Sequence, residues 1–370
     1  MRSPMDEKTF LDFYKNTMLS YSNNLQRYVC KWLEKDHRIT FDSQLSMEDS
    51  SDTLFFESKK DFKGIINRTT TNLAFVNFYE LFEFKKLYKY SVPFFFEMNE
   101  DKTVQEILTQ KEIVIFDSDY TADYIIDSTL KEAKPLAYIE GDKVFLKFTL
   151  QKVYFDAETY DKVDYRYPIL IYIDTSLKVL EVRYDSIRFG ENVDREAYSK
   201  TVNSCVAWIQ ENLSMDLFVC EHCDAIKVIN DKDNTDVRMY KQMMEMSSGG
   251  SAELTASESA DYVLPFIGEI RELIDENEDL FNESEEIKQI LLQYLSDKEA
   301  TASYPYIYVK WVNPVESQSY VVKITFDYFN NAFTLLQHIT GNCNDLGMER
   351  MNNAIEYLCK SGSFVKGEKI

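Results

Sequence analysis

The stretch Val144-Phe-Leu-Lys-Phe-Thr-Leu150 decides the fold, because its residues alternate with a period of two. Val144, Leu146, Phe148 and Leu150 share one side of an extended chain, which predicts a β-strand. Two further apolar runs follow, ILIYID (169–174) and VLEVRY (179–184). Only the four residues 175–178 separate these runs, so the spacing predicts an antiparallel meander over 144–184.

A second strand pair is predicted near the end of the chain. Residues 306–312 and 320–328 flank the polar segment NPVESQS (313–319), and the later run alternates cleanly between Val322, Ile324 and Phe326 and their neighbours. The spacing predicts a C-terminal hairpin over 306–328. Strands joined in hairpins, with helices grouped outside them, predict the α+β class.

Helical spacing of apolar residues predicts the remaining elements. We expect helices over 7–35, 72–90, 194–213, 264–276, 285–296 and 346–358. In the helix over 285–296, the side chains expected to point inward are Ile287, Ile290, Leu291 and Tyr294. Residues 246–260 (MSSGGSAELTASESA) have the composition of a flexible linker or mobile loop.

These elements predict four successive segments. They are a mostly helical, charge-neutral segment 1–140, a meander plus helix 141–245, the linker 246–260, and a segment 261–370 of acidic helices, hairpin and closing helix.

Composition excludes several classes of protein. The 370 residues include only 10 Gly and 7 Pro, and neither G-x-G-x-x-G nor G-x-x-x-x-G-K-[ST] occurs. Glycine-dependent dinucleotide and triphosphate sites are therefore not expected. The six cysteines are too few and too scattered for a disulfide scaffold, and the start of the chain lacks the apolar core of a signal peptide, so we expect a cytoplasmic protein that is not bound to a membrane.

The net charge of −22 is unevenly distributed. Residues 1–90 are nearly neutral, so the acidic excess lies in the rest of the chain and disfavours binding to a phosphate backbone there. The lysines in residues 1–90 are expected to form an ordinary solvated surface. Nucleic-acid binding is the weaker alternative, and only this part of the chain could provide it. The candidate lysines are Lys59, Lys60, Lys63, Lys85 and Lys86.

The segment IVIFDSDYT (113–121) carries a possible catalytic motif. An apolar strand followed by D-x-D-x-T resembles the first motif of haloacid-dehalogenase-type phosphotransferases. The resemblance implies Asp117 as nucleophile, Asp119 as acid/base and a Mg²⁺ ion beside them. It covers nine residues, and Tyr120 stands where the family has glycine. The alternative is a strand end whose acids cap the next segment.

A nuclease-like pattern is the second candidate for Mg²⁺ chemistry. Asp61 is followed by Glu83-Phe-Lys85, which satisfies D…(D/E)-x-K, a pattern in which two carboxylates hold the metal and a lysine polarises the attacking water or phosphate. Similar acid-x-Lys pairs recur elsewhere in the chain by chance. Because 72–90 is expected to be helical, Glu83 and Lys85 would not face each other.

Cys220-Glu-His222-Cys223 is a weak candidate for zinc. Two thiolates with this spacing can share one Zn²⁺, but a closed site needs two more ligands and no second C-x-x-C or H-x₃₋₅-H exists. Two thiols in or beside a strand are the expected alternative.

These observations favour a non-catalytic cytoplasmic interaction subunit that binds a protein partner, as in a bacterial multi-protein or antiviral defence system. Nine acidic residues and one basic residue occur from 269 to 286, and we expect Glu269, Glu272, Glu276 and Glu278 to contact a basic partner. No cofactor is expected. A Mg²⁺-dependent phosphoryl-transfer enzyme or nuclease is the alternative.

Overall fold

The computed structural model describes residues 4–41, 53–156, 159–187, 196–222, 225–229, 237–245, 251–255, 267–301, 303–312, 319–328, 333–339 and 347–370. The chain forms two compact units. Unit 1 comprises residues 1–219, 344–353 and 366–370, and unit 2 comprises 220–343 and 354–365. The helical start of the chain and the predicted meander therefore belong to the same unit.

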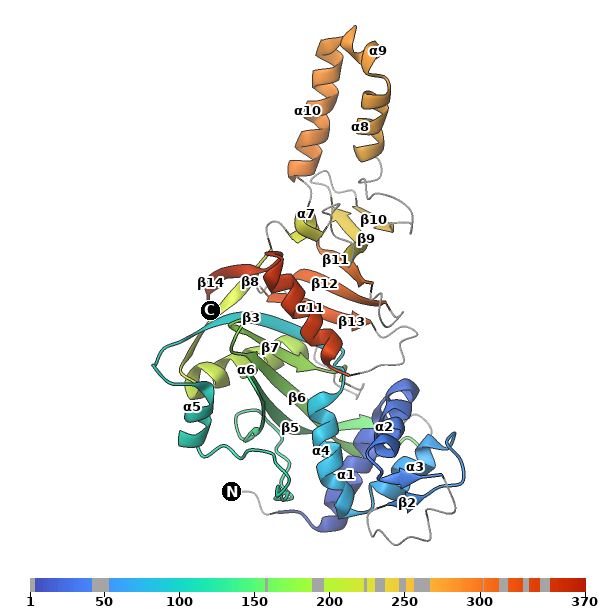
Figure 1. The fold of residues 1–370 in the computed structure, drawn as a ribbon, viewed down its shortest axis with the longest axis vertical. Coiled ribbons are helices and arrows are strands. Elements are labelled where there is room, and N and C mark those ends of the chain that lie inside the picture. The colour runs from blue at the N-terminus through green and yellow to red at the C-terminus, as the bar shows by residue number, and fades with distance from the viewer. Residues whose placement is uncertain are drawn as a thin grey trace. The chain divides into compact units, whose positions relative to one another are not determined.

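Unit 1 is built on an antiparallel sheet in which β4, β5, β6, β7 and β3 are successive neighbours (Figure 1). On the far side of β3 the sheet continues through β8, which also pairs with β14. The strands are β3 (Tyr90–Met98), β4 (Leu136–Glu140), β5 (Lys143–Phe155), β6 (Lys162–Asp174), β7 (Val179–Tyr184), β8 (Met215–Glu221) and β14 (Val365–Lys369). The predicted meander and the α+β class are confirmed.

Both faces of this sheet are buried. Because side chains alternate along a strand, Phe148 and Lys147 of β5 point to opposite faces. Phe148 packs edge-to-face on Trp208 of α6 (Ala197–Asn212), with ring centroids 5.0 Å apart. Lys147 points to the other face, toward α4 (Val76–Lys85), where it bonds to Glu80. The polar side of the meander therefore faces a helix and not water.

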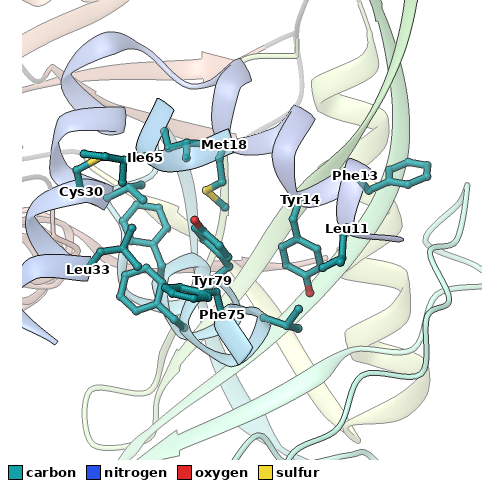
Figure 2. Packing of buried hydrophobic residues seen from close by; sticks show 14 of the residues in the cluster. Leu11, Phe13, Tyr14, Met18, Cys30, Leu33, Ile65, Phe75 and Tyr79 are labelled. Carbon is teal, nitrogen blue, oxygen red and sulfur yellow. The ribbon is translucent and has the colours of Figure 1, made fainter. Parts of the chain in front are cut away.

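The N-terminal helices form a core of their own beside this sheet. They are α1 (Glu7–Ser20), α2 (Asn23–Lys35) and α3 (Phe62–Thr69), and they pack with the short η2 (Leu73–Phe75) and with α4. Met18, Leu33, Ile65 and Phe75 are fully buried there (Figure 2). The single helix predicted over 7–35 is two helices, because Tyr21 leaves the helical conformation and the Ser22 hydroxyl accepts a hydrogen bond from the Leu25 amide to cap α2.

Helix α1 also closes one side of β6. Strand β7 pairs with β6 from Ile169 onward, so among the described residues the earlier part of β6 has a strand partner on one side only, β5. There the Thr17 hydroxyl accepts from the Arg166 amide (2.8 Å), and the Asn16 amide group donates to the Asp164 carbonyl (2.9 Å). Pro168, two residues further, has no N–H to satisfy. Side chains of a helix thus replace a neighbouring strand.

Unit 2 contains a second antiparallel strand series, in the order β10, β9, β11, β12 and β13. These strands are β9 (Val237–Glu245), β10 (Ser251–Thr255), β11 (Tyr306–Trp311), β12 (Tyr320–Tyr328) and β13 (Phe333–Ile339). The predicted hairpin is β11 and β12. Part of the predicted linker, 251–255, is strand β10, and the rest of 246–260 lies outside the described residues.

Three helices follow β10 in unit 2. They are α8 (Ile267–Glu276), α9 (Glu278–Asn282) and α10 (Glu285–Thr301), and α8 and α10 lie side by side with α9 at their joined ends (Figure 1). Among their described side chains, Ile274 and Leu295 are buried and pack with Met244 of β9, and Ile270, Phe281, Leu291 and Leu292 are partly buried against them. The remaining described elements are α5 (Val104–Gln110), α7 (Ala225–Ile229), α11 (Glu349–Lys360), β1 (Ile39–Thr40) and β2 (Leu54–Phe55).

Candidate functional site

The D-x-D-x-T segment is not the end of a strand. Residues 113–116 form a single bridge, between Ile115 and Ala137, and Val114 and Ile115 are exposed. Asp117 accepts a hydrogen bond from the Asp119 amide (2.9 Å), which closes a local turn. Both carboxylates are exposed, so the strand-end geometry that the phosphotransferase resemblance requires is absent here.

The nuclease-like residues have separate partners. Asp61 caps α3 by accepting from the Gly64 amide (2.9 Å). Glu83 is fully buried against Lys147 (2.9 Å), and Lys85 pairs instead with Glu140 on β4. The three groups that would have to share one Mg²⁺ are each engaged elsewhere.

The lysines of the predicted basic surface do not all lie at the surface. Lys86 is not a surface residue: it is fully buried, pairs with Asp185, and its ammonium lies 3.5 Å from the centroid of the Tyr88 ring. Lys59 pairs with Glu34, whereas Lys60 and Lys63 are exposed. Further cations of residues 1–90 are also exposed, among them Arg27, Lys31, Arg68 and Lys89, so nucleic-acid binding by this part of the chain stays a prediction.

The zinc candidates are only partly described. Cys220 is buried, and Cys223 lies outside the described residues. The ring of His222 stacks on Phe326 with centroids 4.0 Å apart, and burial lowers the pKa of His222. Within the described ranges, no group of three or more His, Cys, Asp or Glu side chains gathers as metal ligands.

A charged cluster that sequence reasoning missed lies between α4 and the sheet. Glu80 and Glu83 are one helical turn apart, and both face Lys147 of β5 and Arg166 of β6. Arg166 donates to Glu80 (2.5 Å) and Glu83 (3.1 Å), and the Tyr14 hydroxyl donates to Glu80. Two acids and two bases are thus enclosed together, and all four side chains are buried.

The cluster holds its charges tightly. Burial would raise the pKa of Glu80, but Arg166 and Lys147 beside it lower that pKa from 4.5 to about 2. Burial would likewise lower the pKa of Arg166, but the two carboxylates keep it above its usual value. The carboxylate of Glu80 is therefore ionised near neutral pH, where it pairs with Lys147 and Arg166.

Unit 1 also has a cleft of about 560 Å³. Trp32 at the end of α2, Phe78 on α4, Phe116 and Tyr138 supply aromatic surface to it. Lys35 and Arg38 supply positive charge, and Asp36 and Asp117, the latter at the turn described above, supply carboxylates. Only Asp117 was found by sequence reasoning, because the other lining residues come from separate elements with no common motif.

The helices α8 to α10 expose apolar side chains that were predicted to be buried. Ile287, Ile290 and Tyr294 of α10 are 55%, 68% and 53% exposed. Residues three and seven apart lie on one side of a helix, so these three form a continuous stripe, which we call the α10 stripe. Their predicted inward orientation is wrong: Leu295 occupies the buried side, and Leu291 is partly buried beside it.

Many acidic side chains of α8 to α10 are exposed, like the α10 stripe. Glu276 and Glu278, two of the predicted contact residues, are exposed, and Glu278 makes only a loose pair with Lys288 (3.7 Å). Further exposed acids of α8 to α10 are Asp275, Asp279, Glu283, Glu285, Glu286 and Asp297. The side chains of Glu269 and Glu272 lie outside the described ones.

None of the helices within the described ranges has the length and apolar character needed to cross a bilayer. No protein-family model matches the chain, and no curated protein matches its sequence.

Proposed function

We propose that this protein is a non-catalytic interaction subunit, and that α8 to α10 bind a basic amphipathic helix of a protein partner. The observation that carries the proposal is the α10 stripe, three large apolar side chains that are each more than half exposed. Contiguous exposed apolar surface rimmed by polar residues is typical of a site that another protein covers.

The charge around the stripe defines the chemistry of the partner. The acidic excess over 269–286 repels a second copy of the same helices and attracts lysine and arginine. An amphipathic helix places apolar anchors at every third or fourth position and charged residues beside them, which matches an apolar stripe within an acidic surface.

The dispersal of the candidate catalytic groups supports a non-catalytic role. Asp61, Glu83 and Lys85 each have a different partner, and the carboxylates of Asp117 and Asp119 lie at an exposed turn. The enzyme alternative therefore has no converging set of groups among the described residues.

Binding of two synthetic helical peptides to the full chain tests the proposal. Both peptides carry the same leucine stripe, one flanked by lysines and the other by glutamates, and fluorescence anisotropy measures their affinities. We expect only the basic peptide to bind, and its affinity to fall as salt rises. Ile287→Ser/Ile290→Ser should abolish binding, whereas Gln289→Ser/Gln293→Ser on the same helix should not.

Equal binding of the two peptides would contradict the charge argument. Binding that survives Ile287→Ser/Ile290→Ser would contradict the role of the α10 stripe. The melting temperature of each variant is the control for folding, since all four substituted side chains are exposed.

A further inference from the structure

The cleft of unit 1 is of the size and composition of a small-molecule site. Its volume of about 560 Å³ lies within the ~300–1,000 Å³ range of ligand pockets. Such pockets combine mostly apolar walls with a few polar groups that fix the orientation of the ligand. Here Trp32, Phe78, Phe116 and Tyr138 provide apolar surface. Two cations, Lys35 and Arg38, and two carboxylates, Asp36 and Asp117, provide the charge.

The aromatic residues of the cleft are held in place by rings behind them. Phe116 packs on Phe84 (5.7 Å between centroids), and Tyr138 packs on the same ring (5.5 Å). Trp32 packs edge-to-face on Phe82 (5.6 Å). Aromatic surfaces fixed in this way lose little side-chain entropy when a flat ligand stacks on them.

The two cations retain capacity to bind an anion. Arg38 uses its Nε to donate to Asp36 (3.1 Å), which leaves the terminal guanidinium nitrogens available as donors. Lys35 is exposed, and among the described residues no side chain pairs with it. A lysine and an arginine together can hold a phosphate as a point charge and a fork of donors.

The carboxylate side of the cleft is fixed and able to accept further hydrogen bonds. One oxygen of Asp117 accepts from the Asp119 amide, and the other has no such bond. The loop that carries Asp117 is tied to α4, because the Asn77 side chain donates to the Tyr120 carbonyl (3.0 Å). A carboxylate held at the edge of an aromatic pocket suits the N–H groups of a nucleobase.

We infer that this cleft binds a nucleoside monophosphate group. Its base stacks on the aromatic walls and donates to Asp117, and its phosphate is held by Lys35 and Arg38. This chemistry can come from a free nucleotide or from the end of an oligonucleotide. The site is distinct from the α10 stripe and does not depend on the proposed function.

Calorimetry on the full chain with four probes tests the inference. The probes are adenosine monophosphate, adenosine, inorganic phosphate, and a 5′-phosphorylated tetranucleotide. We expect the monophosphate to bind and both adenosine and phosphate to bind at least tenfold more weakly. A tetranucleotide that binds more tightly than the monophosphate identifies a nucleic-acid end as the source, and equal or weaker binding identifies the free nucleotide.

Three variants locate the binding. Lys35→Ser should weaken the monophosphate about tenfold, whereas Lys131→Ser, an exposed lysine outside the cleft, should leave it unchanged. Ser118→Trp, at an exposed lining residue, should fill the cleft and abolish binding without changing the melting temperature. Failure of all probes to bind, phosphate binding as tightly as the monophosphate, or unchanged binding by Ser118→Trp would overturn the inference.

Discussion

At the scale of single residues, the charged cluster between α4 and the sheet shows that charged side chains of β5 and β6 are buried, although the strand pattern predicts that they face solvent. Lys147 occupies a position that looks solvent-facing in an alternating strand, yet it is buried against Glu80 and Glu83. Such a cluster contributes little when complete, because desolvation offsets attraction, but removing one member leaves a buried charge without compensation.

Lys147→Ala should therefore destabilise the protein strongly. The carboxylates of Glu80 and Glu83 would share Arg166 alone, and we expect the free energy of unfolding to fall by about 3–5 kcal/mol. Urea denaturation measures the change, and Lys143→Ala at the start of the same strand is the control. A loss as small as that of the control would show that the cluster relaxes without cost.

The pH dependence of the free energy of unfolding should reveal the lowered pKa of Glu80. Its pKa falls from 4.5 to about 2 on folding, so the contribution of its carboxylate is complete above pH 4.5 and is lost as the pH falls toward 2. Glu80→Gln should thus be less stable than the wild type at pH 7, and this difference should shrink below pH 4.5. A difference that is constant with pH would argue against the salt-bridged carboxylate.

Residue identity alone could not predict this cluster. The sequence pattern singled out Glu83 for its spacing to Lys85, but Glu83 finds its cation on β5, 64 residues away. Asp117 was singled out as a nucleophile at a strand end, a geometry that does not form, and it lines a cleft that the sequence did not predict. Short motifs capture local spacing, whereas both sites are assembled from residues far apart in the chain.

At the scale of elements, α10 packs by a different face from the one that its sequence predicted. Its apolar residues are spaced so that two sides of the helix are both plausible as the inner face, and periodicity cannot choose between them. The structure selects Leu295, which packs with Ile274 and Met244, and leaves the α10 stripe outside.

Two alanine substitutions on α10 should distinguish its faces. Leu295→Ala removes a buried side chain and should cost about 2–5 kcal/mol of stability. Ile290→Ala, on the exposed side, should change stability by no more than about 0.5 kcal/mol. Thermal or urea unfolding of the full chain measures both, and the reverse ranking would mean that α10 packs by its other face.

A second prediction at this scale concerns the hydrogen bond between Thr17 of α1 and the backbone of β6. Thr17→Val keeps the shape of the side chain but removes the hydroxyl that accepts from the Arg166 amide. Because the site is buried, we expect a loss of about 1–3 kcal/mol. Thr9→Val, at the exposed start of the same helix, is the matched control, and equal losses would mean that the Arg166 amide finds another acceptor.

At the scale of the whole molecule, the regions with the most buried side chains should unfold locally least often. All six residues of β7 are buried, and so is every residue of β6 in the part that pairs with β7 (169–174). By contrast, α8 to α10 bury only two described side chains fully enough to form a core with Met244.

Amide hydrogen exchange should reveal this difference directly. We expect β6 and β7 to exchange most slowly, at rates set by global unfolding, and α8 to α10 to exchange much faster through local opening. Mass spectrometry of peptides from the exchanged full chain gives both rates. Equal protection of the two regions would contradict a small, weakly packed helical core.

The fold class was readable from the sequence because strand alternation is a local property of the chain. The runs 144–150, 169–174 and 179–184 each carry a strand signal, and the structure confirms the meander that they predict. The division into two units was not readable, since residues 344–353 and 366–370 return to the unit formed by the start of the chain. Such returns depend on packing between distant segments, which no local pattern records.

Because α1 precedes β6 in the chain, the helix that covers this strand edge is synthesised before the strand itself. Open strand edges invite pairing with other chains. The side chains of Asn16 and Thr17 that cover this one are translated some 150 residues before the strand they cover. Since synthesis runs from the N-terminus, the cover leaves the ribosome first, and β6 emerges beside a helix that is ready to receive it. A chain that lacks α1 would present this part of β6 uncovered, and we expect it to self-associate more readily than the full chain.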